Sequence, residues 1–157
     1  MELTALIIDT RSKKVKQFSL PVDVEYVALE FGYDEEDDVF IIQSIEELPA
    51  LNCEGLTLDL ANEIAENLEN VDEDLVLSFI ESNSSDPKYL ASAEFDDCSL
   101  YPDVSTDEEL GEYLLDEVGL ELSKQTLQNY FDYEGFGRDV RLEEGGSFVD
   151  KGYFVSR

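Results

Sequence analysis

The chain has no histidine and no tryptophan, and only two of its 157 residues are cysteines, Cys53 and Cys98. Without histidine it has no Ser-His-Asp triad, no Cys-His pair and no histidine-ligated metal. The cysteines form no CxxC motif, so we expect two reduced thiols. Bases are also scarce, since ten Lys plus Arg oppose 39 Asp plus Glu, for a formal charge of −29. A surface so acidic repels nucleic acids and anionic membranes, so we expect the chain to bind neither directly.

Long hydrophobic runs are missing as well. No stretch of about 18 apolar residues occurs, so no transmembrane helix is predicted. The segment MELTALIIDTRSKK carries its charges after its apolar stretch, unlike a secretory signal. Hydrophobic residues nevertheless make up 43% of the chain, too many for an acidic disordered protein. We therefore expect a folded cytoplasmic protein that is not an enzyme and needs no cofactor or metal.

The few bases are unevenly distributed. Nine of the ten lie near the chain ends, and between Gln17 and Ser123 there are 31 acids and one base, Lys88. A generic soluble domain intersperses the two signs, because a field of one sign is less favourable than paired charges. The placement therefore calls for an explanation beyond solubility.

Residue patterns predict an α+β fold. Residues 3–8, 15–20 and 38–44 read as strands, the first two joined by the basic turn TRSKK. Residues 21–32 fit either a strand or a helix. The period becomes helical from Thr57, with an apolar stripe at Leu60, Ile64 and Leu68. Helices are also predicted over 73–82, capped by Asp72, and from Asp86-Pro87.

Further helices and a hairpin are predicted in the last third. Thr106 to Glu109 form a capping box that opens a helix with apolar positions Leu110, Tyr113, Leu114 and Val118, ended by Gly119. Ser123 is predicted to cap a short helix carrying Leu127 and Tyr130. Residues 147–155 read as a hairpin with its turn at Lys151-Gly152. We expect three small modules: a β-rich N-terminal one (1–52), a central helical one (53–92) and a C-terminal α+β one (93–157).

Carboxylates recur on the faces of these helices opposite the apolar stripes. Like charges at this spacing cost about 0.2–0.5 kcal/mol per pair. First-turn acids such as Asp72, Glu73 and Asp74 differ, because they favour the helix dipole and need no function. They give one charge per ~5 Å of helix axis, against ~3.4 Å for the phosphates of one DNA strand. The candidate DNA-mimic surface comprises Asp59, Glu63, Glu66, Glu69, Asp72, Glu73, Asp74, Glu81, Asp107, Glu108, Glu109, Glu112, Asp116 and Glu117.

The length of such a mimic can be bounded. At duplex density, 39 carboxylates would span about 66 Å, whereas a compact chain of this length is roughly 40 Å across. We therefore expect an elongated or dimeric protein.

Several readings of the acids compete on residues alone. A halophilic surface fits the composition but does not explain the placement of the bases. A Ca²⁺ loop at 34–38 fails the EF-hand template, because Val39 stands where glycine is needed. A glycosidase-like carboxylate pair carries almost no signal among so many acids. The remaining reading is a decoy whose carboxylates stand in for phosphates.

The stretch 127–142, LQNYFDYEGFGRDVRL, resembles the C-terminal signature of ArdA-type antirestriction proteins. The segment 109–119 resembles the acidic antirestriction motif of that family, and VFIIQSIEELP (39–49) is similar to its strand followed by an acidic turn. The chain departs from the family at Phe18-Ser-Leu-Pro21, where a tryptophan is common.

The resemblance implies an elongated, three-module protein encoded on a mobile element. It implies mimicry of B-form DNA in the DNA-binding groove of type I restriction-modification enzymes, with restriction and often modification inhibited. It also implies a homodimer formed through the C-terminal part. Another decoy target, such as a CRISPR effector or nucleoid protein, stays open.

The signature residues are expected to serve the fold or the dimer. Gly135 and Gly137 are expected in a tight turn, and Arg138 in an ion pair with a nearby acid such as Asp132 or Asp139. The full set of dimer or fold residues is Tyr113, Tyr130, Tyr133, Phe136 and Arg138.

Overall fold

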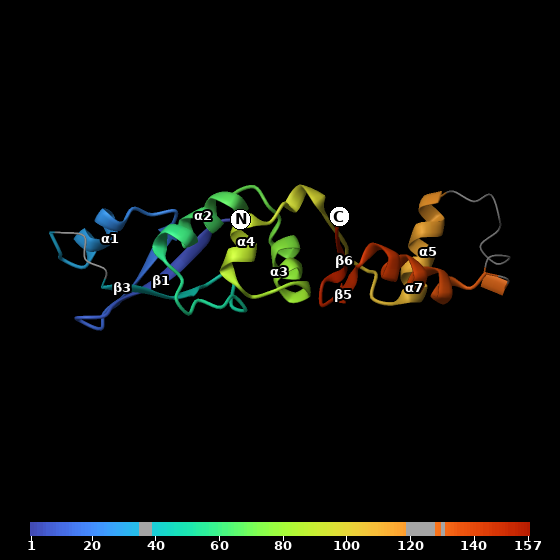
Figure 1. Ribbon diagram of the computed structural model, residues 1–157, viewed down its shortest axis with the longest axis horizontal. Coiled ribbons are helices and arrows are strands. Elements are labelled where there is room, and N and C mark those ends of the chain that lie inside the picture. Colours follow the sequence, from blue (N-terminus) through green and yellow to red (C-terminus); the bar gives the residue numbers. More distant parts are fainter. Residues whose placement is uncertain (35–38, 119–127, 130) are drawn as a thin grey trace. The chain divides into compact units, whose positions relative to one another are not determined.

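The structure, a computed structural model, describes residues 1–34, 39–118, 128–129 and 131–157 (Figure 1). It contains helices and two small antiparallel sheets, so the predicted α+β class is confirmed. The chain divides into two compact units, Met1–Ala93 and Glu94–Arg157. The finer separation of 1–52 from 53–92, and the elongated shape, stay predictions.

The first unit is built on a three-stranded sheet of order β2-β1-β3. Its strands are β1 (Leu3–Asp9), β2 (Val15–Leu20) and β3 (Phe40–Ile45), all antiparallel and close to their predicted positions. Side chains of β1 alternate between buried and half-buried, because successive residues of a strand point to opposite faces. Leu3, Ala5 and Ile7 are thereby placed in the core.

A buried carboxylate fixes the turn between β1 and β2. Asp9 is fully buried and accepts hydrogen bonds from Ser12 Oγ (2.6 Å), Tyr33 Oη (2.6 Å) and the backbone N–H of Arg11 (3.0 Å). Burial disfavours the charged carboxylate, but these donors outweigh it and lower the pKa of Asp9 to about 2. The charge of Asp9 therefore orders the basic turn.

The helices α1, α2, α3 and α4 complete the described part of the first unit (Figure 1). The ambiguous segment 21–32 contains the helix α1 (Val24–Glu30). The predicted helices follow as α2 (Leu58–Leu68), α3 (Glu73–Ser82) and α4 (Pro87–Ser92). Each begins after a side chain that caps it: Thr57 accepts from the N–H of Leu60, Asp72 from Asp74 and Leu75, and Asp86 from Lys88. Local cap chemistry thus sets where these helices start.

The second unit packs the helices α5 and α7 with a small sheet of order β4-β6-β5. A 3₁₀ turn, η1 (Phe95–Asp97), leads into β4 (Cys98–Tyr101). The helices are α5 (Asp107–Val118) and α7 (Tyr133–Glu144). The hairpin is β5 (Ser147–Val149) and β6 (Gly152–Ser156). The core of the second unit contains Val104, Leu110, Tyr153 and Val155.

The second unit agrees with the sequence prediction at its hairpin but differs at other points. The hairpin is confirmed, but Val149 pairs with Gly152, so its two-residue turn is Asp150-Lys151, one residue earlier than expected. Gly119 as a helix end, and Ser123, Leu127 and Tyr130 in a short helix, lie outside the described residues. The strand β4 and the helix α7 were not predicted as such.

Candidate functional site

The acids of α2 are exposed, and its apolar residues are buried. Ala61, Ile64, Ala65 and Leu68 face the core, whereas Asp59, Glu63 and Glu66 are exposed. Leu60, expected in the buried stripe, is half-buried. The acids that follow α2 in the sequence are exposed as well: Glu69, Asp72, Glu73, Asp74 and Glu81.

Neutral amide side chains tie α2 to its neighbours. Asn62 exchanges two hydrogen bonds with the backbone of Val22, at 2.9 and 3.0 Å. Asn67 Nδ2 donates to the carbonyl oxygens of Leu90 (3.1 Å) and Ala93 (3.0 Å), at and just after α4. These anchors carry no charge, so they hold the helix without neutralising its acids.

The second acidic helix, α5, has the same division of faces. Leu110 and Leu115 are buried, while Glu108, Glu109, Asp116 and Glu117 are exposed. Asp107 and Glu112 are half-buried. Of the predicted apolar positions, Tyr113 and Leu114 are half-buried, and nothing is described for the side chain of Val118.

Two glycines let the backbones of α5 and α7 touch. A Cβ atom built at Gly137 would overlap the carbonyl oxygen of Asp107, and one at Gly111 would overlap that of Tyr133. These obstacles are backbone atoms, which cannot swing aside as a side chain can. The expectation of a tight turn at Gly135 and Gly137 was wrong: both lie within α7, where Gly137 permits close packing of two helices.

Arginines link elements of the second unit, and Arg141 links the acidic helix α5 to α7. Arg141 of α7 donates from Nε to Asp107 Oδ1 (2.8 Å) and from Nη2 to Asp107 Oδ2 (3.3 Å). The hydrogen bond to Asp107 raises the pKa of Arg141. Arg157 binds Glu144 (3.3 Å), and Glu144 accepts from the hydroxyl of the buried Tyr153 (3.1 Å). Burial and then this bond to Glu144 raise the pKa of Tyr153.

Some acids of the candidate surface also stabilise helix starts. Glu109 accepts hydrogen bonds from the backbone N–H (2.7 Å) and hydroxyl (2.8 Å) of Ser105, and these bonds lower its pKa. In the predicted capping box, the Glu109 side chain therefore reaches Ser105, while Thr106 Oγ1 accepts from the N–H of Glu109 (3.2 Å). Asp72 caps α3 in the same sense.

The signature residues occupy different environments. Tyr113 is half-buried, packs at a tilt against Tyr101 (ring centroids 5.0 Å apart) and donates a hydrogen bond to Glu117 (3.3 Å). Tyr133 is buried, and burial followed by the charges of Glu112 and Asp116 raises its pKa. Phe136 is half-buried against Phe131. Tyr130 lies outside the described residues.

The expectation for Arg138 was wrong: in the described part of the chain, it does not form the expected ion pair. Arg138 is exposed on α7, and no ion pair joins it to Asp132 or Asp139. Asp132 instead caps α7 by accepting from the N–H of Gly135 (2.9 Å). The arginine that joins the two helices is Arg141, three residues later, which the sequence reading did not single out.

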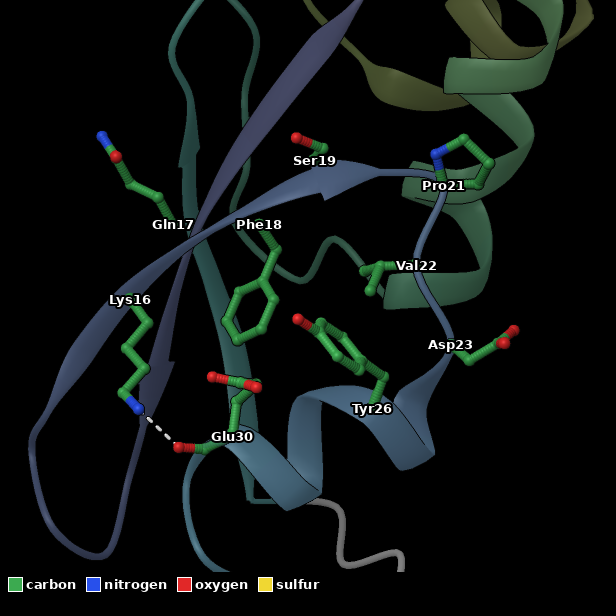
Figure 2. A pocket seen from close by; sticks show the side chains of 9 residues that line it. All are labelled: Lys16, Gln17, Phe18, Ser19, Pro21, Val22, Asp23, Tyr26 and Glu30. Atoms are coloured by element: carbon green, nitrogen blue, oxygen red, sulfur yellow. Dashed lines mark hydrogen bonds between the residues drawn. The ribbon is translucent and has the colours of Figure 1, made fainter.

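A hollow of about 600 Å³ lies between β2 and α1 (Figure 2). Phe18 and Tyr26 meet edge-on there, with ring centroids 6.3 Å apart, and Lys16 Nζ donates to the carbonyl oxygen of Glu30. The lining combines one ammonium group with the carboxylates of Asp23 and Glu30, and its lysine already has a backbone partner. The lining residues do not include a nucleophile hydrogen-bonded to a base, which is the arrangement that nucleophilic catalysis uses.

The described ranges contain no group of three or more Cys, Asp or Glu residues placed to hold a metal ion. Most of the 34–38 acidic run lies outside those ranges. Both cysteines are free, and burial raises the pKa of Cys53. In the same part of the chain, no helix combines the length and apolarity needed to cross a membrane.

Comparison with protein families gives a match over most of the chain. The model of a family described as antirestriction protein (ArdA) matches residues 12–155, nearly the whole chain. The match includes α2, α3, α5 and α7, and thus every residue of the candidate acidic surface. No curated protein matches the chain.

Proposed function

The chain belongs to the ArdA family of antirestriction proteins, and on this basis we propose that it inhibits type I restriction-modification enzymes by mimicking B-form DNA. In this proposal the carboxylates of α2, α3 and α5 occupy the positions of phosphates in the enzyme's DNA-binding groove. The inhibition is competitive and non-catalytic, and it takes place in the cytoplasm of a bacterial host.

One observation carries the proposal. Of the fourteen acids in the candidate surface, all but Asp107 and Glu112 are exposed. Those on α2 and α5 lie opposite buried apolar residues on helices held by anchors elsewhere. Rows of carboxylates on fixed helices are what a groove lined with Lys and Arg would meet in place of a phosphate backbone.

Affinity would come from many weak contacts. Each Lys or Arg in the groove that meets a carboxylate releases bound counterions, as it does on meeting a phosphate. The protein also avoids the cost of bending a duplex or extruding a base, which DNA substrates can require. Inhibition should therefore fall with rising salt, and no single acid should dominate it.

The direct test is competition for a DNA site between this protein and labelled duplex on a purified type I enzyme. We expect the protein to displace the duplex at low salt. As salt is raised from 50 to 200 mM, its apparent affinity for the enzyme should fall on the order of tenfold or more if several contacts are made. A wild-type protein that fails to displace the duplex at low salt, or whose inhibition is insensitive to salt, would rule out the proposal.

Block variants test where the mimic lies. Neutralising Asp59, Glu63, Glu66 and Glu69 together should weaken competition strongly, whereas each single change should have a small effect. Neutralising a matched block of four exposed acids, Glu25, Glu30, Asp96 and Asp97, removes the same charge at positions that are not among the fourteen acids of the candidate surface. Equal loss in both blocks would show that total charge decides inhibition and that the α2 row has no special part.

We also propose that the protein acts as a homodimer formed through the second unit. Leu142 supports this, because it is a large apolar side chain that is 66% exposed on α7. Arg138 lies one turn earlier on the same helix and is exposed as well. Sedimentation should give a dimer mass for the wild type and a monomer mass for Leu142→Glu; a wild-type monomer at all concentrations would exclude the dimer.

A further inference from the structure

The acidic helix α5 is poorly suited to hold its own position. It carries six acids and no base over twelve residues, and its last turn contains Asp116 and Glu117. Acids near a helix C-terminus oppose the helix dipole, and Glu108, Glu112 and Asp116 repel one another at i, i+4 spacing. A helix of this length is marginal in water without tertiary contacts. Whatever fixes α5 must therefore come from outside it.

Two contacts with α7 supply that restraint. Gly111 and Gly137 bring the two backbones together, which sets the distance between the helices. Arg141 then binds both carboxylate oxygens of Asp107, the first residue of α5. The pair is half-buried, with side-chain exposures of 27% for Arg141 and 19% for Asp107.

The guanidinium of Arg141 is itself held in place. Its central carbon lies 5.6 Å from the ring centroid of Phe148 on β5, so the arginine is restrained from the sheet side as well. A planar group restrained on its face and bonded through two nitrogens fixes direction as well as distance. Arg141 thus links β5, α7 and the first turn of α5.

We propose that Arg141 is a positioning residue, which sets the orientation of α5 and so directs its row of carboxylates outward. The inference rests on the proposed function, because the value of a fixed row lies in being recognised as a phosphate backbone. One of the scarce bases would thus support an acidic surface. Arg141 lowers the net negative charge by one unit, but it holds the other carboxylates of α5 in the orientation that the target enzyme would recognise.

Two variants break the same pair with opposite effects on charge. Arg141→Gln changes the formal charge from −29 to −30, whereas Asp107→Asn changes it to −28. If inhibition followed charge alone, the first would strengthen competition with DNA and the second would weaken it. The positioning role predicts that both weaken it, by about tenfold each, because each breaks a charge-assisted pair.

Lys14→Gln is the matched control for Arg141→Gln. It produces the same change of charge at an exposed lysine in the β1–β2 turn, where only backbone atoms of Lys14 make the described hydrogen bonds. We expect it to inhibit as well as the wild type or slightly better. Arg141→Lys keeps the charge but loses the two-nitrogen geometry, and we expect it to recover part of the inhibition.

Amide hydrogen exchange of the free variants gives a readout that is independent of the enzyme. Arg141→Gln and Asp107→Asn should speed amide exchange in α5 and leave exchange in α2 at the wild-type rate. In the Lys14→Gln control, both helices should exchange at the wild-type rate. Should either variant unfold the second unit, the comparison of Arg141→Lys with the wild type carries the test in its place.

The outcomes separate the two proposals. A wild-type protein that does not compete with DNA overturns the proposed function and this inference together. A competent wild type with Arg141→Gln equal to or better than Lys14→Gln leaves the function standing and overturns the positioning role. Weaker inhibition by both Arg141→Gln and Asp107→Asn, with faster exchange in α5, supports it.

Discussion

The two acidic helices, α2 and α5, present similar faces to solvent but are held by different means. The helix α2 is fixed by buried Ala61, Ile64 and Leu68 and by the uncharged amides of Asn62 and Asn67. The helix α5 also buries Leu110 and Leu115, but it is held by a glycine-to-backbone crossing and an arginine instead of amides.

The difference shows two solutions to one electrostatic problem. A helix covered with acids needs partners that do not cancel those acids. Amides provide hydrogen bonds without charge, and they succeed in α2 because carbonyls at the end of α4 accept them. The arginine succeeds in α5 because it binds Asp107, which lies half-buried at the helix start rather than on the exposed row.

The largest expected effect comes from Gly137→Ala, which attacks the anchor of α5. The added methyl overlaps the backbone of Asp107, and overpacking of this kind costs about 3 kcal/mol. Hydrogen exchange should show α5 and α7 opening while α2 keeps its protection.

Gly135→Ala is its control on the same helix. The added methyl there meets the side chain of Asp132, which can rotate away, so we expect loss of little more than a cap, about 1 kcal/mol. Equal destabilisation by both changes would refute the importance of the crossing.

Next in size is Asn67→Ala, which attacks the anchor of α2. It leaves the carbonyls of Leu90 and Ala93 without this donor, at a cost of about 1–3 kcal/mol. Hydrogen exchange should rise in α2 and α4 and remain unchanged in α5. The exposed Asn70→Ala should alter stability by less than about 0.5 kcal/mol; a similar loss there would remove the special role of Asn67.

Lowering the pH should loosen the first turn of α5 but not that of α2. The folded-state pKa of Glu109 is lowered, so its contribution is present above its unfolded pKa and is lost as pH falls through the lower folded value. Thr57, which caps α2, has no such titration. NMR of backbone amides should therefore show the first turn of α5 loosening in this range, and Glu109→Gln should remove the pH dependence of the Ser105 amide. An unchanged Ser105 titration in that variant would contradict the assignment.

The smallest effect sharpens the comparison from the exposed side. Glu63→Gln relieves repulsion from Asp59 one turn earlier and should stabilise α2 by about 0.2–0.5 kcal/mol, measurable as a small rise in melting temperature. Glu54→Gln, outside the helix, should leave the melting temperature unchanged. Destabilisation by Glu63→Gln would show that this carboxylate has a structural partner.

Features determined by neighbouring residues were predictable from the sequence. The starts of α2, α3, α4 and α5 follow from caps within three residues, and the exposure of their acids follows from amphipathic spacing. The hairpin β5–β6 was found for the same reason, apart from its turn position.

Features that depend on distant residues were not predictable. Gly135 and Gly137 suggested a turn because glycine disfavours helices, and only the backbone of α5 explains Gly137 in α7. Arg141 and Asp107 are 34 residues apart, and no local pattern pairs them. In hindsight, Gly111 within a helical stripe was a signal that another backbone approaches there. The strand β4 has only half-buried residues and shows no alternation.

Direct contact of the α5 and α7 backbones has a consequence for how this protein can change over generations. Because no side chains separate the two axes at the crossing, exchanges on the outer surface of α5 leave the spacing of the axes as it is. Asp and Glu can replace one another there, and new ones can be tried, without repacking the interior. Point mutations can therefore change the exposed side chains of α5 as restriction enzymes change, while the packing of α5 on α7 is retained.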